Sequence, residues 1–213
     1  MDENQRWHRR QLMETTATAL QKNGFVTSLF DTREEAIAFL LETTAGAATV
    51  GFGGSMTLAE LGLPELLEKA GKTTLIHGRP GLSPEERRRI MQEQLGCDLF
   101  YTSTNALTLK GQLVNIDATG NRVCGMVFGP KRVMVVAGVN KIAADLEGAL
   151  KRVKEVACPP NAKRLNFDTP CAKTGRCTDC QSPQRICRVT TIIERCPRAT
   201  DLRVCLINDN LGY

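Results

Sequence analysis

A glycine turn near residue 50 is the first group of residues whose spacing suggests chemistry. It reads Val50-Gly51-Phe52-Gly53-Gly54-Ser55-Met56-Thr57 and lies between an apolar segment and a segment with helical spacing. Glycines let the backbone approach a ligand closely, and amides at a helix N-terminus attract anions. The turn matches neither the Gly-x-Gly-x-x-Gly dinucleotide pattern nor the P-loop, which disfavours nucleotide hydrolysis. We expect an anion to bind at Gly51, Gly53, Gly54, Ser55 and Thr57.

That expectation has a structural alternative. A tight turn from a strand into a helix, with a Ser or Thr cap, needs similar residues when no ligand is present. Three glycines in four positions exceed what a cap alone requires. The sequence therefore favours a ligand role for the glycine turn without excluding the structural one.

A second group is the cysteines of the C-terminal fifth, spaced Cys171-x5-Cys177-x2-Cys180-x6-Cys187. Thiolates two residues apart can converge on one metal ion, and four thiolates complete a structural zinc site or hold an iron–sulfur cluster. The spacing matches neither a zinc finger nor a ferredoxin, so redox-active thiols and inert cysteines remain alternatives. We expect a metal site, with zinc or an iron–sulfur cluster, at Cys171, Cys177, Cys180 and Cys187.

A third group is polar and lies near the expected ends of strands, where open α/β sheets bind ligands. Arg122 and Lys141 are the candidates for pairing with a carboxylate or phosphate. Asn and Asp beside turns also close local hydrogen bonds, so a purely structural role is the alternative. The expected ligand residues of this group are Asn105, Asn121, Arg122, Asn140 and Lys141.

No catalytic constellation emerges from the sequence. His77 precedes Gly78 after a short apolar segment. A lone histidine in such a place is more often structural than catalytic, and no nucleophile is placed beside it. The catalytic residues, if any, are therefore not identified from sequence.

The first half of the chain alternates helices with short apolar strands, which predicts a mostly parallel sheet covered on both faces. Asp31 and Glu34 are expected to form a capping pair, and Ser83-Pro84-Glu85-Glu86 is typical of a helix start. The expected helices are 5–23, 34–42, 58–70 with a break at Pro64, and 84–95. The expected strands are 25–30, 47–50, 73–76 and 98–103.

The second half begins with period-two alternation over residues 106–117 around a Lys-Gly turn, which predicts a β-hairpin. Residues 122–128 are expected to be extended, 133–137 to form a central buried strand, 142–156 a helix and 203–207 a last strand. We expect one domain, with its core in residues 1–157 and a cysteine-rich segment, 158–213, completing it.

Composition sets the broad class. The chain has 213 residues, of which 42% are hydrophobic and 24% charged, and its net charge of +5 is spread along its length. The composition is that of a globular protein. The dispersed net charge is only a weak argument for nucleic-acid binding, so no nucleic acid is expected as a partner. The N-terminus lacks the apolar stretch of a secretory signal, and no segment approaches the length of a membrane span. We expect a cytoplasmic protein, whose nine cysteines are metal ligands or thiols before disulfides.

Six short motifs together resemble the lactate-utilization (LUD) domain family, and in size the chain is closest to the lactate utilization protein C branch. The resemblance runs almost end to end, through the glycine turn 51–55 and segments 102–108, 111–115, 120–122, 128–130 and 138–141. It implies a Rossmann-like α/β fold similar to ribose-phosphate isomerase and CoA transferases, in which glycine turns bind phosphates or acyl carriers. The cysteine-rich tail resembles a feature of a short, single-domain branch.

The resemblance also implies a function. Family membership suggests that the protein assists the oxidation of lactate or a related small hydroxy acid, or the linked electron transfer, in a complex with iron–sulfur proteins. Two alternatives stay open: a non-catalytic metal-binding or redox-sensing module, and an enzyme that binds CoA or a phosphorylated substrate. The expected partners are an anionic small molecule, iron–sulfur electron-transfer proteins and, as a further option, a second copy of the chain.

Overall fold

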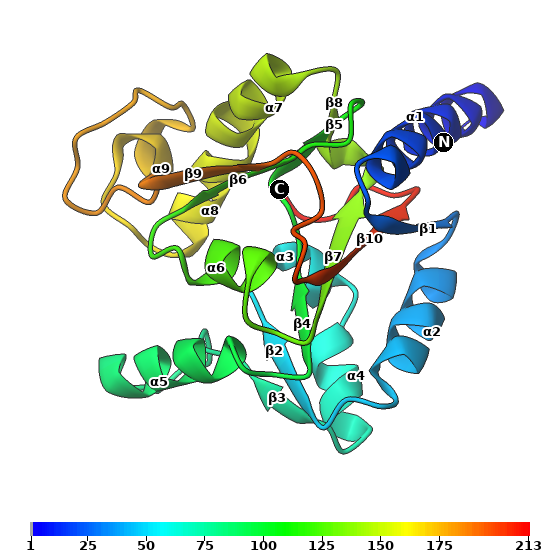
Figure 1. The fold of residues 1–213 in the computed structure, drawn as a ribbon. Coiled ribbons are helices and arrows are strands. Elements are labelled where there is room, and N and C mark those ends of the chain that lie inside the picture. The colour runs from blue at the N-terminus through cyan, green and yellow to red at the C-terminus, as the bar shows by residue number, and fades with distance from the viewer. Residues whose placement is uncertain (1) are drawn as a thin grey trace.

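A parallel sheet forms the centre of the protein (Figure 1), as described by a computed structural model for residues 2–213. In these residues the sheet has six strands in the order β1-β10-β7-β4-β2-β3. All neighbouring strands run parallel. The strands are β1 (Val26–Phe30), β2 (Thr49–Phe52), β3 (Thr73–Leu75), β4 (Leu99–Thr102), β7 (Arg132–Gly138) and β10 (Asp201–Ile207).

The central strand β7 shows why this sheet is covered on both sides. Its side chains alternate between two separate cores: Val133 and Val135 face one, and Met134 and Val136 face the other. All four are completely buried. Burying each such side chain contributes about 1.5–3 kcal/mol, so a strand that is apolar at every position is stable only between two layers.

Helices on both faces supply those layers (Figure 1). Leucines and alanines from α2 (Arg33–Thr44), α3 (Met56–Glu60) and α4 (Leu63–Lys69) fill the core on one face. The other face is covered by α1 (Glu3–Lys22) and α6 (Asn121–Val127), while α5 (Pro84–Gln94) contacts β2 and β3.

A smaller second sheet packs on the same face as α1 and α6. Its order is β8-β5-β6-β9, with strands β5 (Ala106–Thr108), β6 (Leu113–Asp117), β8 (Ile142–Ala143) and β9 (Val189–Ile193). The antiparallel pair β5 and β6 confirms the predicted hairpin. Leu107 and Leu113 point into the core shared with the large sheet, whereas Ala106 and Val114 pack against the helical run that follows β8.

The C-terminal segment contributes to both sheets. β9 pairs with β6, and β10 inserts between β1 and β7. Between β7 and β9 the chain forms a 3₁₀ turn (Val139–Lys141), then β8, and then a helical run of α7 (Leu146–Arg152), a π-helical turn (Val153–Ala157), α8 (Cys158–Arg164) and α9 (Pro170–Thr174). Residues 157 and 158 lie inside one continuous helical run, and the domain division at that point stays a prediction.

The α/β class with a parallel sheet is confirmed, but several predicted elements are wrong. Residues 122–128 form helix α6 and not an extended segment, because Gly120 takes a left-handed conformation (φ +87°) and Asp117 accepts from the amide of Val123 at 3.2 Å. The single helix predicted over 142–156 is a short strand, α7 and a π-helical turn, with Asp145 capping α7. Strand β9 was not predicted.

Two smaller errors concern helix ends. The break predicted at Pro64 lies at Gly62, whose positive φ separates α3 from α4, and Pro64 sits in the first turn of α4, where proline is tolerated. The capping pair of α2 is Thr32 with Glu35, one residue later than predicted. The capping box of α5, formed by Ser83 and Glu86, is as expected. Among the described helices, none combines the length and apolarity needed to cross a membrane.

The turn of the hairpin is held against helix α1, and this contact can be tested. Gly111 has φ +75°, and a Cβ there would lie 2.6 Å from the backbone nitrogen of Leu20. We predict that Gly111→Ala lowers the free energy of unfolding by at least about 2 kcal/mol, through backbone strain plus overpacking. Urea denaturation followed by circular dichroism measures the change.

Gly81→Ala is the matched control. Gly81 also has a positive φ, of +83°, but has no neighbouring atom within 4 Å of an added Cβ. Gly81→Ala should therefore lower the free energy of unfolding only by the cost of backbone strain, about 1 kcal/mol. Equal losses in the two variants would contradict the close packing of the hairpin turn on α1.

Candidate functional site

The carboxyl ends of β2 and β4 form the point where the chain changes direction in the large sheet. From β2 the chain passes to β3 on one side, and from β4 it passes to β7 on the other. Open α/β sheets bind ligands in the crevice at such a switch point. The residues that follow the two strands here are the glycine turn 53–57 and Ser103.

A buried lysine occupies the switch point. The Nζ atom of Lys141 donates to the Oγ1 of Thr57 at 2.8 Å and to the Oγ of Ser103 at 2.9 Å. Burial, with the nearby guanidinium groups of Arg152 and Arg122, lowers the pKa of Lys141 to about 7. With this pKa, Lys141 can lose its proton near neutral pH, whereas an exposed lysine stays protonated there.

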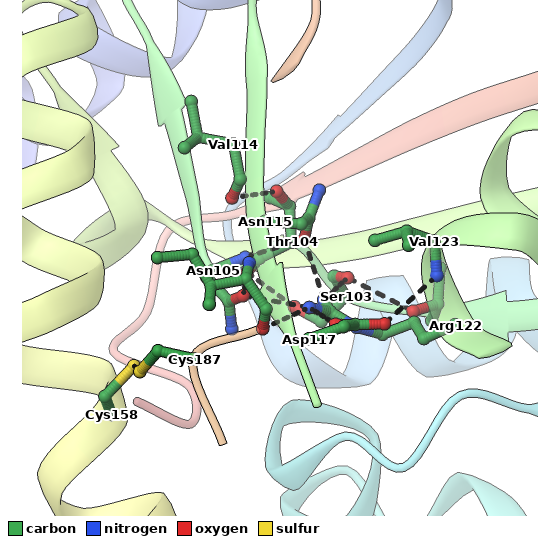
Figure 2. Close-up of polar contacts among 12 residues, drawn as sticks. Ser103, Thr104, Asn105, Val114, Asn115, Asp117, Arg122, Val123, Cys158 and Cys187 are labelled. Atoms are coloured by element: carbon green, nitrogen blue, oxygen red, sulfur yellow. Dashed lines mark hydrogen bonds and ion pairs between the residues drawn. The ribbon is translucent and has the colours of Figure 1, made fainter. Parts of the chain in front are cut away.

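A second cation, Arg122, is the centre of a hydrogen-bonded hub beside Lys141 (Figure 2). Its guanidinium forms an ion pair with Asp117, in which the Arg122 and Asp117 side chains are 12% and 8% exposed. It also donates to Asn115 at 2.7 Å, to Asn105 at 2.9 Å and to the Ser103 carbonyl at 3.0 Å. These acceptors use all five N–H groups of the guanidinium, so none is left for a ligand.

The glycine turn is shaped by this packing. A Cβ on Gly53 would lie 2.8 Å from Thr102 Oγ1 and 3.1 Å from Arg122 Cγ, and one on Gly51 would lie 2.9 Å from the Phe100 ring. Gly54 has φ +70° and faces His77. Two of the three glycines are thus explained by close packing, and the third by its backbone conformation.

The two hydroxyls of the turn have local partners. Ser55 caps α3 by accepting from the Leu58 amide at 3.4 Å. Thr57 is completely buried and donates to the Leu211 carbonyl at 3.2 Å. Because α3 has only five residues, its amides offer a weaker field to an anion than the longer helix predicted from sequence.

Asn140 lies in the 3₁₀ turn after β7, and Asn121 is the first residue of α6. The amide side chain of Asn140 holds the C-terminal segment, donating to the Gly212 carbonyl at 3.3 Å and accepting from the Leu211 amide at 3.1 Å. The Nδ2 atom of Asn121, in the first turn of α6, is buried without a hydrogen-bond partner among the described residues. Ligand roles for the predicted set of residues stay predictions.

An open cleft of about 560 Å³ adjoins the glycine turn and lies over the carboxyl ends of β2 and β3. Gly54 and Ser55 form one wall, and His77 and Arg79 form another. Arg79 is paired with Glu68, whereas Arg164, from the end of α8, forms no ion pair with any of residues 2–213. The cleft therefore combines backbone of the glycine turn with an arginine that has no carboxylate partner.

The hydrogen bonds of His77 define its protonation. The Nε2 of Gln94 donates to the carbonyls of Phe52 and Leu75, both at 2.8 Å, which fixes the orientation of this amide. The same NH₂ group lies 3.1 Å from His77 Nδ1, which must therefore be the acceptor. Since burial lowers the pKa of His77, the ring is neutral at pH 7 and carries its proton on Nε2, the nitrogen nearest Gly54.

The cysteines gather around a different, smaller cavity of about 20 Å³. All four predicted metal ligands line it, and Cys158 from α8 joins them. The sulfur atoms of Cys158 and Cys187 are 3.4 Å apart (Figure 2). Within residues 2–213, no three His, Cys, Asp or Glu side chains are arranged to hold a single metal ion, and each described cysteine is a free thiol.

Charges around this cavity favour thiolates. The Cys158 thiol and the cations Arg185 and Lys154 lower the pKa of Cys187. The hydrogen bond with the Cys187 thiol, burial and the other nearby thiols raise the pKa of Cys158. The pair therefore holds one negative charge more readily than two.

The sequence did not single out Arg164, placed Cys158 beside the expected metal ligands and not among them, and gave His77 a structural role. Arg164 lies in a part of the chain where no helix was expected, so the sequence gave no reason to place its side chain in the cleft. Cys158 precedes two prolines, 13 residues before the next cysteine. The high number of cysteines in the C-terminal segment was the only available signal, and it did not show that α8 would bring Cys158 next to them.

The fold is that of a Rossmann-like α/β protein, with an open cleft at the carboxyl edge of its parallel sheet. The family model of the LUD domain matches residues 13–207. The chain therefore belongs to the LUD domain family.

A solved structure supports the same fold. A DUF162 family protein from Deinococcus radiodurans aligns with a TM-score of 0.55 over 93% of this chain and 98% of that one, at 13% sequence identity. At this identity the likeness concerns the fold alone. No curated protein matches the sequence.

The buried lysine makes stability depend on pH in a predictable direction. The pKa of Lys141 falls from 10.5 to about 7 on folding, so the unfolded chain binds the proton more tightly between these values. Stability from this group therefore rises with pH over that window. We predict that the free energy of unfolding of the wild type rises relative to that of Lys141→Met between pH 7 and about 10.

Urea denaturation of both proteins at several pH values measures this difference. Thr57 and Ser103 keep carbonyl acceptors for their own protons in the variant, which limits secondary effects. Curves that run parallel over the whole window would contradict a lowered pKa for Lys141.

Proposed function

We propose that this LUD-domain protein binds a small hydroxy acid such as lactate in the cleft over β2 and β3 and assists its oxidation within a complex. The observation that carries the proposal is the cleft beside the glycine turn, with Arg164 free of any carboxylate among residues 2–213. A guanidinium in this position suits a carboxylate, since the two groups form charge-assisted, bidentate hydrogen bonds.

His77 supports the same ligand. Its Nε2–H lies at the glycine turn and can donate to the hydroxyl or keto oxygen of a bound acid. Because the ring is neutral, it adds a donor to the cleft without adding charge. Arg164 and His77 together would recognise the two functional groups that define a hydroxy acid.

The wider setting follows from the family and the thiols. Two-electron oxidation of a hydroxy acid needs an acceptor, for which we propose iron–sulfur electron-transfer proteins as partners. Free cysteines persist in a reducing compartment, which supports a cytoplasmic location. Self-association of the chain would be compatible with this role.

The volume of the cleft favours a second candidate. At about 560 Å³ it falls in the range of about 300–1,000 Å³ typical of larger ligands and exceeds what a three-carbon acid fills. A CoA thioester or a phosphorylated metabolite would use the same Arg164 through its phosphate. The ligand class is therefore tested by comparing lactate with CoA.

Calorimetric titration of the purified protein with L-lactate tests the proposal. We predict binding by the wild type and an affinity about 10- to 100-fold lower for Arg164→Ala, the loss expected for one charged hydrogen-bonded contact. Arg6→Ala is the matched control, because Arg6 is an exposed arginine in α1, a helix that contributes no residue to the lining of the cleft, and should leave the affinity unchanged.

Two results would count against hydroxy-acid binding in the cleft. One is equal weakening by Arg164→Ala and Arg6→Ala, which would indicate a general charge effect. The other is absence of lactate binding by the wild type. Binding of CoA in the same assay, lost with Arg164→Ala, would then support the second candidate.

A further inference from the structure

Strand β9 (Val189–Ile193) is an open edge of the small sheet. It pairs with β6 on one side and has no strand on the other. Among residues 2–213, only β6 forms hydrogen bonds with the backbone of β9, so the outward amides and carbonyls of β9 have no protein partner. Val189 and Ile192 are 39% and 37% exposed. An edge of this kind can accept a further strand.

The sequence of β9 favours such pairing. It reads Val-Thr-Thr-Ile-Ile, so every residue is β-branched and suits a strand. Natural edge strands are commonly protected by proline or lysine, and β9 contains neither. The edges β3 and β8 have only three and two residues, whereas β9 and β1 have five each. β9 and β1 are therefore the edges long enough for a stable added strand.

Opposite charges stand at the two ends of β9. Arg188 precedes the strand and Glu194 follows it, and both are exposed. Arg188 donates to the carbonyls of Pro183 at 2.6 Å and Arg185 at 2.9 Å. The ion pairs formed within residues 2–213 include neither Arg188 nor Glu194. A positive and a negative charge are thus left at opposite ends of one open strand.

A second copy of the strand complements this edge. In an antiparallel pair, opposing side chains point to the same face, so a two-fold axis between two copies must pass at a residue and not between residues. With the axis at Thr191, all of β9 is paired and Arg188 of each copy lies opposite Glu194 of the other. An axis at Thr190 puts Arg188 opposite Ile192, and an axis at Ile192 puts Glu194 opposite Thr190. Only the register centred on Thr191 therefore matches the charges.

We propose that the protein forms a symmetric dimer, in which the β9 strands of two copies pair antiparallel about Thr191 and join the small sheets. Two ion pairs between Arg188 and Glu194 would flank the joined strands, and opposite charges facing each other across strands are stabilising. Strand β1 lacks this complementarity, because the same pairing about Ser28 would put Asp31 opposite Phe25.

Sedimentation velocity of the full chain at several concentrations tests the proposal. Low salt keeps the charges unscreened, and a reductant prevents disulfides between copies. The wild type should be a dimer that dissociates on dilution. Glu194→Arg replaces two ion pairs with two like-charged pairs, so we predict a dimer dissociation constant raised about 10-fold or more.

Glu42→Arg is the matched control. Glu42 is an exposed glutamate in α2, a helix on the face of the large sheet opposite to the small sheet. It makes the same change of charge away from β9 and should leave the dissociation constant unchanged. Equal weakening by Glu42→Arg and Glu194→Arg would overturn the proposal, as would a wild type that stays monomeric up to its solubility limit.

Mixing two variants tests the register itself. Arg188→Glu alone leaves two negative pairs beside the joined strands, and Glu194→Arg alone leaves two positive pairs, so each should dimerise weakly. In a mixture, each variant supplies the charge that the other lacks, and a heterodimer should form. A mixture no more dimeric than its components would contradict pairing about Thr191.

Folding of the variants is checked by circular dichroism, because Arg188→Glu also loses the hydrogen bonds to Pro183 and Arg185. If Arg188→Glu does not fold, the comparison of Glu194→Arg with Glu42→Arg decides the proposal. These measurements use no ligand, so the dimer and the hydroxy-acid site can fail separately.

Discussion

The ion pair between Arg122 and Asp117 is the interaction on which the arrangement of the two sheets depends. Asp117 ends β6 of the small sheet, and Arg122 is the second residue of α6, which packs on the large sheet through Val123 and Met126. A buried ion pair is stable only when its remaining donors and acceptors are satisfied. Here two asparagines and a backbone carbonyl satisfy the guanidinium, and the Val123 amide satisfies the carboxylate.

The ion pair and its hydrogen-bond partners determine which part of the carboxyl edge of the large sheet stays open. They fill the space beyond β4 with polar side chains that already have partners, and Lys141 with the segment around Leu211 closes the switch point itself. The opening that remains lies one strand further out, over β2 and β3, where the glycine turn meets His77. The open cleft is therefore displaced from the switch point by the packing of the small sheet.

Much of the large sheet was predictable because its strands are apolar on both faces and are separated by helices with clear caps. The segment that forms α6 was not, since Arg122–Phe128 has no helical periodicity of its own and is helical because Gly120 and Asp117 start the helix. The break of the predicted helix after residue 142 was missed for a similar reason: Ile142 and Ala143 pair with β5, a long-range contact.

The residues of the candidate sites also fall into those that the sequence could predict and those that it could not. The glycine turn and the cysteine tail were visible as local patterns, whereas their partners were not. Arg164 and Cys158 are brought to their cavities by the path of α8, and no spacing in the sequence encodes that path. A ligand role for Arg122 stays a prediction; its five N–H groups donate to protein acceptors that come from β6 and from the segment after β4.

The central claim is that ligands bind in the open cleft and not at the buried switch point. Amide chemical shifts recorded by nuclear magnetic resonance during titration with L-lactate or CoA test it most directly, because they report the location of binding. If ligands bind in the open cleft, the shifts are concentrated at Gly54, Ser55, His77 and Gly78. Shifts concentrated at Asn105, Asn121 and Asn140, with none at the cleft, would contradict it.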